Sequence, residues 1–424
     1  MSEEKSRRKS LGYLIFLIIF LSLVEIFDTY TTLFPNVIVS KVQDEFLAHE
    51  TQVIADSIMS LAIAVASIGM YFVVINQFLA DLIGRRIMLF ITVLGMGLAS
   101  LFIFFTTNLI HYTSSLFFLY VFFSSDIWTI YISEESPKER RGLYLNLILV
   151  AGCIGAILVP VFRSIFITET SPVTAWRSMT IFAFLAIPIA FLMLGIKETS
   201  KYKELKEMRK SDDFVKQSPF INLKKPFDKQ YRKQFVPILI MAFISGLNYI
   251  FIQMGESFLA NNVNLEEGDV NIVVTIMSVS AICGYLITGV FVDKVGRKPL
   301  FYIYTILTPI AIFIVIIGVQ SPDLALIAAC IGAGLATITF YGLGIVNRLV
   351  SIEILPTDIR GTGTGWRSII SAIGITCGLL LNSILNLIFG LGISFLIISL
   401  LLLINIPIIY RYIKETKGIE LETV

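Results

Sequence analysis

The sequence has few charged residues for its length. Asp, Glu, Lys and Arg make up 15% of the 424 residues and 56% are hydrophobic, whereas a soluble globular domain carries about 25% charged residues. This is the composition of a polytopic membrane protein with little of the chain outside lipid. The net charge of +2 gives no reason to expect a nucleic-acid partner.

Cysteine and histidine are also scarce. The four cysteines (Cys153, Cys283, Cys330 and Cys377) lie within apolar segments and lack the spacing of metal ligands. We therefore expect them to pack as small apolar residues, with no metal site and no cofactor. The sequence shows no nucleotide-binding motif and no nucleophile–base pattern, so we do not expect an enzyme.

Long apolar runs fill most of the chain. Residues 1–10 are polar and basic, and the run that follows is a full span without a small-residue cleavage site, which argues against a signal peptide. Twelve segments are long enough to span a bilayer, and backbone groups in hydrocarbon must be satisfied within each segment, so we expect helices. The segments are 11–33, 54–79, 88–107, 112–133, 143–165, 178–196, 235–260, 270–292, 299–319, 323–350, 362–385 and 389–412.

The basic residues predict the orientation. If alternate loops face one side, that side holds 28 of the 33 Lys and Arg residues. The bias places both termini and the long central loop in the cytoplasm, and it favours an even number of spans in the cytoplasmic membrane. The five basic residues outside this pattern are Lys41, Arg163, Arg177, Arg348 and Arg367.

One polar stretch divides the spans into two sets of six. We expect residues 1–196 and 235–424 to form two pseudo-symmetric six-helix bundles, joined by a cytoplasmic linker over 197–234. We expect the linker to tether the two halves, and a regulatory docking site is the alternative.

A charged motif appears once in each half at a matching place. Asp293, Gly296 and Arg297 lie in a short loop between two spans, and Asp81, Gly84 and Arg85 precede them by 212 residues. This repeat indicates that the chain arose by duplication. Asp81 and Asp293 are expected to accept hydrogen bonds from the N-terminal amides of a neighbouring helix.

Two further motifs repeat in register. Glu134 to Arg141 and Glu353 to Arg360 both read E-x-x-P-x-x-x-R, with an offset of 219, and Lys-Glu-Thr recurs at 197 and 414. Acids and bases at neighbouring helix ends can bridge in one conformation and separate in another. We interpret these motifs as a latch on the cytoplasmic face, and helix capping with orientation by basic loops is the alternative.

On these motifs the chain resembles the major facilitator superfamily, and within it the sugar porters and related metabolite–proton symporters. Residues 289–298 are similar to the family's G-x-x-x-D-x-x-G-R-K loop, and the tail at 414–418 is similar to the sugar-porter Pro-Glu-Thr-Lys-Gly ending. Phe27-Asp28-Thr29 and Ser245-Gly-Leu-Asn248 resemble further sugar-porter motifs. The resemblance implies twelve spans that work by alternating access.

The chain departs from sugar porters at positions that matter for the substrate. Ala242 and Phe243 stand where two glutamines are usual, and Leu149 replaces a third. Ser114 stands where an arginine is expected in the fourth span. These departures weaken the prediction of a sugar site.

The first span carries a polar stripe. Glu25, Asp28, Thr29 and Thr32 follow helical spacing on an otherwise apolar helix. Because charges in the membrane are costly, two acids on one face imply water access or protonation. We expect Asp28 to carry the transported proton, with Glu25 or Asp126 tuning it; polar residues near the outer interface are the alternative.

Later spans supply candidates for binding the substrate. They are Asn248, Tyr249, Glu256, Tyr341, Arg348 and Arg367. Arginine binds carboxylates bidentately, so the last two favour an organic anion if they face the path. Alternatively, both extend to the cytoplasmic interface.

The sequence thus predicts a secondary active transporter that takes up a small organic solute, either an organic acid or a sugar, together with protons. A passive facilitator or exporter of the same fold is one alternative, and a transporter-like nutrient receptor is another. The partners expected are the solute, protons and the lipid bilayer, with the chain acting as a monomer.

Overall fold

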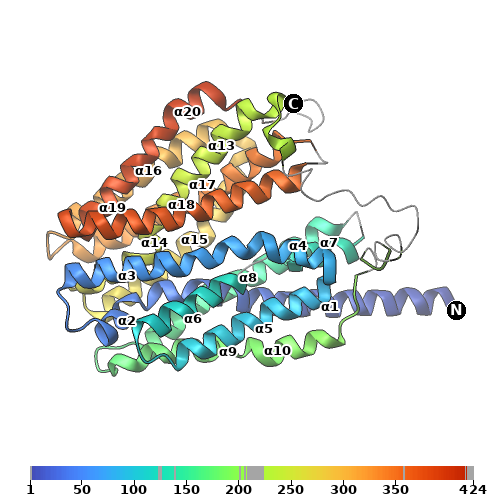
Figure 1. Cartoon of the computed structure of the whole chain (residues 1–424), viewed down its shortest axis with the longest axis horizontal. Helices are drawn as coiled ribbons and strands as arrows, with labels where there is room; N and C mark the ends of the chain where they lie inside the picture. The colour runs from blue at the N-terminus through green and yellow to red at the C-terminus, as the bar shows by residue number, and fades with distance from the viewer. Residues whose placement is uncertain are drawn as a thin grey trace. The chain divides into compact units, whose positions relative to one another are not determined.

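The computed structural model describes residues 2–122, 127–137, 140–199, 202–204, 207, 224–356, 359–415 and 417. This part of the chain is helical, without strands. It contains 12 helices that are long and apolar enough to cross a membrane, so the expected all-α fold with twelve spans is confirmed (Figure 1). Most of the linker expected at 197–234 lies outside the described residues.

The helices of the first six spans begin and end as follows: α1 (Ser2–Leu33) and η1 (Phe34–Val37); α3 (Gln52–Ser67), η2 (Ile68–Phe72) and α4 (Val73–Ile83); α5 (Arg85–Phe104); α6 (Leu109–Phe122) and α7 (Ile127–Glu135); α8 (Arg141–Phe166); η4 (Val173–Ser178), α9 (Met179–Phe184), α10 (Ala186–Leu192) and η5 (Met193–Gly195). A short helix, α2 (Val39–Phe46), connects the first span to the second.

The second six spans follow the short helix η6 (Lys225–Phe227). Their helices are α13 (Lys229–Leu247), α14 (Ile250–Ser257) and η7 (Phe258–Asn262); α15 (Glu267–Val295); α16 (Arg297–Gly318); α17 (Ala325–Glu353); α18 (Arg360–Phe389); α19 (Leu391–Leu400), η8 (Leu401–Ile404) and α20 (Asn405–Tyr412).

Contacts group the chain into two compact units. Unit 1 comprises Met1–Pro35, Gly69–Phe162 and Arg177–Lys216, and unit 2 comprises Asn36–Ile68, Arg163–Trp176 and Gln217–Val424. Two segments of the first half of the sequence, 36–68 and 163–176, therefore pack with helices of the second half. The division into bundles at residues 196 and 235 remains a prediction.

In unit 1, α5 is the central helix. Helices α4, α6, α9 and α10 all pack against it. Elsewhere in the unit, α8 approaches α1 closely, because a Cβ atom added at Gly155 would collide with the carbonyl oxygen of Ile26. Small residues permit such close approach between membrane helices.

In unit 2, α17 packs against α15 and α16, while α18 packs against α13 and α3. Figure 1 shows α3 running alongside α18. The contact between α13 and α18 is also close, because a Cβ atom at Gly374 would meet the carbonyl oxygen of Phe243. An apolar core of buried side chains, including Phe235, Phe301 and Val346, lies between α13, α16 and α17.

The seventh span is interrupted. α13 ends at Leu247 and α14 begins at Ile250, so Asn248 and Tyr249 lie between two helical pieces. After α14 the chain forms a π-helical turn over Phe258–Asn262. The polar side chains at 248 and 249 thus lie at the start of α14, and Glu256 lies near its end.

Candidate functional site

The first charged motif forms a cluster at the junction of α4 and α5. Gly84 joins the two helices with a φ of 111°. Arg85 then places its guanidinium 3.2 Å from the carboxylate of Glu134, and it also donates to the carbonyl oxygen of Ala80 at 3.3 Å. Both charged side chains are about nine-tenths buried, with 9% and 11% of their surfaces exposed.

The first amides of α5 are capped by Glu198. Its carboxylate accepts hydrogen bonds from the backbone N–H groups of Arg85 and Arg86, at 3.1 and 3.2 Å. Negative charge is stabilised at a helix N-terminus because the amides there have no intrahelical partners. The Lys-Glu-Thr sequence at 197 is thereby joined to the Gly84 motif.

The same arrangement recurs in unit 2. Arg297 follows Gly296, whose φ is 108°, and its guanidinium lies 2.7 Å from Glu353. It donates to the carbonyl of Val292 at 3.1 Å, which corresponds to Ala80 in the first copy. Each unit therefore contains the same arginine–glutamate bridge within itself.

Glu415 caps α16 as Glu198 caps α5. It accepts from the N–H groups of Arg297 and Lys298, both at 2.9 Å. Burial raises the pKa of Glu415, but these amides, that of Lys417 and the charge of Arg297 outweigh burial, so the net pKa is lowered. Glu415 is thus held as an anion at this helix end.

Asp293 and Arg360 make contacts other than the expected ones. Asp293 is 76% exposed and bridges Arg297 at 3.1 Å, while Glu415 accepts from the helix amides in its place. Arg360 donates to the carbonyls of Ile352 and Leu355, at 2.9 and 3.4 Å, and so caps the end of α17. The side chains of Asp81 and Arg141 lie outside the described residues.

The first-span acids are both within α1. Asp28 is buried, with 5% of its surface exposed. Glu25 accepts a hydrogen bond from Thr29 at 3.4 Å and faces Gly152 of α8, where an added Cβ atom would lie 3.0 Å from its carboxylate. Asp126, the third expected proton-coupling residue, lies outside the described residues.

Three of the expected substrate residues lie around the break in the seventh span and on α17. Asn248 donates to the carbonyl of Ile244 at 3.1 Å, and the hydroxyl of Tyr249 accepts from Asn36 at 3.4 Å. The rings of Tyr249 and Tyr341 each lie next to that of Phe340, at 5.2 and 5.4 Å. This gives a partly aromatic surface with amide groups beside it, a type of lining found in sites for small solutes.

The two expected anion-binding arginines lie on α17 and α18. Arg348 is exposed on α17, and Arg367 is half-buried on α18, where it donates to the hydroxyl of Ser368 at 3.3 Å. Their role in binding remains a prediction.

Glu256 lies in a cluster that the sequence did not predict, which we call the Arg163 cluster (Arg163, Glu256, Glu267, Asn271, Ser40 and Lys41). Arg163 bridges Glu256 at 2.6 Å and Glu267 at 3.3 Å. It also donates to Asn271 and, at 2.7 Å, to the carbonyl of Val37. The arginine side chain is fully buried.

The cluster continues onto α2. Lys41 bridges Glu267 and also lies 3.4 Å from Asp44. Burial lowers the pKa of Lys41, but the hydrogen bond and charge of Glu267, with the charges of Asp44 and Glu256, outweigh it and raise the pKa. Burial raises the pKa of Asp44, and Lys41 opposes that effect. Lys41 is therefore held in its charged form beside the Glu267 carboxylate.

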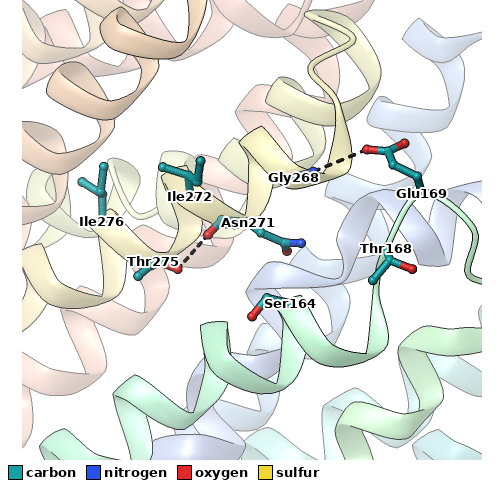
Figure 2. Close-up of a pocket in the computed structure, with 8 residues that line it drawn as sticks. All are labelled: Ser164, Thr168, Glu169, Gly268, Asn271, Ile272, Thr275 and Ile276. Carbon is teal, nitrogen blue, oxygen red and sulfur yellow. Dashed lines mark hydrogen bonds between the residues drawn. The ribbon is translucent and has the colours of Figure 1, made fainter.

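A groove borders this cluster (Figure 2). It has a volume of about 530 Å³ and lies between the end of α8, with Ser164, and the start of α15, with Asn271 and Thr275. Asn271 forms part of its wall and also accepts from Arg163.

Polar side chains also fill the contact between α3 and α18. The amide of Asn382 donates to Ser60 and that of Asn386 to Ser57, both at 2.8 Å, and the hydroxyls of Ser67 and Thr376 lie 2.6 Å apart. A contact made from hydroxyls and amides can separate at a lower cost than an apolar one, because water can replace each hydrogen bond.

The sequence matches the profile of the Major Facilitator Superfamily over residues 15–341 and again over 238–420. The chain belongs to the major facilitator superfamily. It is therefore a multi-pass membrane transporter, as the repeated motifs predicted.

Relatives within the superfamily include transporters of different solutes. The chain is 24% identical over 396 residues to the glucose transporter GlcP of Staphylococcus epidermidis, covering 82% of this chain and 83% of GlcP. It is 24% identical over 355 residues to NiaP of Bacillus subtilis, a protein named for niacin/nicotinamide transport, covering 81% and 83%. The crystal structure of a D-xylose-proton symporter superposes with a TM-score of 0.74 at 17% identity, covering 95% of this chain and 99% of that one.

The glycine between α15 and α16 provides a test of the superfamily motif. A Cβ atom at Gly296 would lie 2.7 Å from the Glu415 carboxylate, in a backbone conformation that side chains rarely adopt. Gly296→Ala should therefore destabilise the protein by about 1–3 kcal/mol, measured as a lower thermal midpoint of the purified transporter. Gly289→Ala is the control, because nothing lies within 4 Å of that position. Equal thermal midpoints for the two variants would contradict the requirement for glycine at position 296.

Proposed function

We propose that this transporter takes up a small organic solute together with protons across the cytoplasmic membrane. The observation that carries the proposal is Asp28, an acid that is 5% exposed in the first membrane-spanning helix. A charge in that position is costly, which favours a carboxyl group that gains and loses a proton during the cycle. No catalytic role is proposed, and the transporter is proposed to act as a monomer in the bilayer.

The orientation follows from the basic residues. With 28 of 33 Lys and Arg on one side, the termini and the Gly84 and Gly296 motifs face the cytoplasm. α15 runs from Glu267 to Val295, next to Gly296, so the Arg163 cluster then lies at the outer side. Polar contacts at opposite ends of the spans are suited to alternating access, in which one set separates while the other is formed.

A carboxylate-bearing solute is favoured over a sugar. The glutamines that sugar porters usually carry before the Ser-Gly of the seventh span are replaced by Ala242 and Phe243. Arg367 supplies a half-buried positive charge on α18, and arginine recognises carboxylates. The named relatives include both a sugar transporter and one named for niacin.

Asp28→Asn tests the coupling. The amide cannot exchange a proton, so the variant should lose uphill accumulation in membrane vesicles while it still exchanges solute down a gradient. Asp323→Asn, an exposed residue between α16 and α17, is the matched control and should accumulate solute normally. Full pH-driven accumulation by Asp28→Asn would remove this residue from the mechanism, and equal transport with and without a proton gradient in the unaltered protein would favour a passive facilitator.

Arg367→Gln tests the substrate class. A hydrogen bond to a charged group is worth roughly 1.5–3 kcal/mol, or about one to two decades of affinity. The variant should lose that much affinity for an organic acid in a competition assay with panels of acids and sugars. Arg411→Gln, an exposed residue at the end of α20, should not. Inhibition by neutral sugars alone, unchanged in Arg367→Gln, would contradict the carboxylate assignment.

A further inference from the structure

Glu256 is held by donors from two segments of the first half of the sequence. Its side chain forms an ion pair with Arg163 and is 2% exposed. One carboxylate oxygen accepts from Arg163 at 2.6 Å and from the Ser40 hydroxyl at 2.5 Å, and the other accepts from the Ser40 backbone N–H at 2.9 Å. Arg163 lies in the last turn of α8 and Ser40 lies on α2, whereas Glu256 belongs to α14.

Acidic side chains outnumber the two basic ones around Glu256. Arg163 and Lys41 are matched by Glu256 and Glu267, and Asp44 lies beside Lys41. Asp56 of α3 is a further acid nearby, and it accepts from Gln43, Gln52, Ser257 and Asn262. Glu169 also lies here, because its carboxylate accepts from the backbone N–H groups of Glu267 and Gly268. Glu256 is thus the acid of this cluster that accepts from both first-half segments: from Arg163 on α8 and from Ser40 on α2.

An ionised carboxylate can accept all three of these hydrogen bonds, whereas a protonated one carries a donor on one oxygen. Removing one partner of a buried ion pair leaves an uncompensated charge, which is strongly unfavourable. If α2 and the end of α8 withdraw when the outer side opens, Glu256 loses every one of these donors at once. A proton from outside can then take the place of Arg163.

We propose that Glu256 is a proton-binding site on the outer side of the transporter, at which Arg163 and a proton alternate as partners of the carboxylate. The proposal rests on the alternating access and the orientation proposed above. It replaces the substrate-binding role that the sequence suggested for Glu256. Protonation opposes closure of the outer side, and formation of the Arg163 bridge expels the proton.

A polar row on α14 connects this site to the break in the seventh span. Tyr249, Gln253 and Glu256 follow helical spacing along one face. Gln253 is fully buried, and neither polar atom of its amide has a hydrogen-bond partner among the described residues. Because a buried amide without a hydrogen-bond partner is unfavourable, this position is suited to a hydrogen-bonding guest. Glu256 is thereby linked to the region of Asn248 and Tyr249.

The test measures opening of the outer side against external pH and needs no substrate. Ser60 is fully buried on α3, where its hydroxyl accepts from Asn382 of α18. Ser60→Cys, in a background with the four native cysteines replaced, should react with a membrane-impermeant thiol reagent only when these helices separate. His49→Cys is the reference for the pH dependence of the reagent, because its side chain is 74% exposed.

The normalised labelling rate at position 60 should rise about tenfold as external pH falls through the titration of one linked carboxyl group. Glu256→Gln should label rapidly at every pH, because the amide cannot form the ion pair. Glu256→Asp should keep a pH response. Arg177→Gln is the matched control, since that arginine bonds the carbonyls of Phe104 and Thr106 within unit 1, and it should behave like the unaltered protein.

A pH response that persists unchanged in Glu256→Gln would overturn the proposal, as would one abolished by Asp28→Asn but kept in Glu256→Gln. Labelling that is independent of pH in the unaltered protein would also overturn it. Failure of the proposed function is distinguishable, because it would appear as uptake that ignores the proton gradient, whatever the labelling result.

Discussion

A guanidinium charge within a membrane span has to be matched by carboxylates, and Arg163 is where this chain meets that constraint most fully. The side chain is completely buried, and it contacts two acids, an amide and a backbone carbonyl. Removing one member of such a pair typically costs 3–5 kcal/mol, although an apolar replacement of the whole pair can be neutral. The pair therefore adds little to the overall stability of the fold, but it can favour the conformation in which it forms over one in which it is broken.

The bridges at Arg85 and Arg297 apply the same chemistry at the other ends of the spans. Each joins an arginine after a positive-φ glycine to a glutamate from a later helix, and a further glutamate caps the helix that the arginine begins. These clusters are repeated in the two units, whereas the Arg163 cluster occurs in unit 2 alone among the described residues. The repeated clusters come from the duplication, and the Arg163 cluster is specific to the first-half segments that pack into unit 2.

The sequence predicted the spans and the repeated motifs because both are local patterns. Hydropathy identifies each helix without knowledge of its neighbours, and the repeated Lys-Glu-Thr is visible in the sequence, although it assigned no role to Glu198 or Glu415. It did not predict which acid caps α16, because that depends on where the tail after α20 returns. Arg163 and Glu256 are 93 residues apart, and their contact depends on packing between α8 and α14. The one signal in the sequence was that Arg163 is among the five basic residues that lie outside the cytoplasmic loops.

Under the proposed alternating access, segments 36–68 and 163–176 separate from the helices of the second half in every transport cycle. Ser67 of α3 and Thr376 of α18 have hydroxyl oxygens 2.6 Å apart, so cysteines at both positions should form a disulfide in a background without the native cysteines. We expect oxidation to stop solute uptake in the double variant, a reductant to restore it, and neither single variant to respond. Uptake that continues at its full rate with the disulfide formed would show that α3 and α18 need not separate during transport.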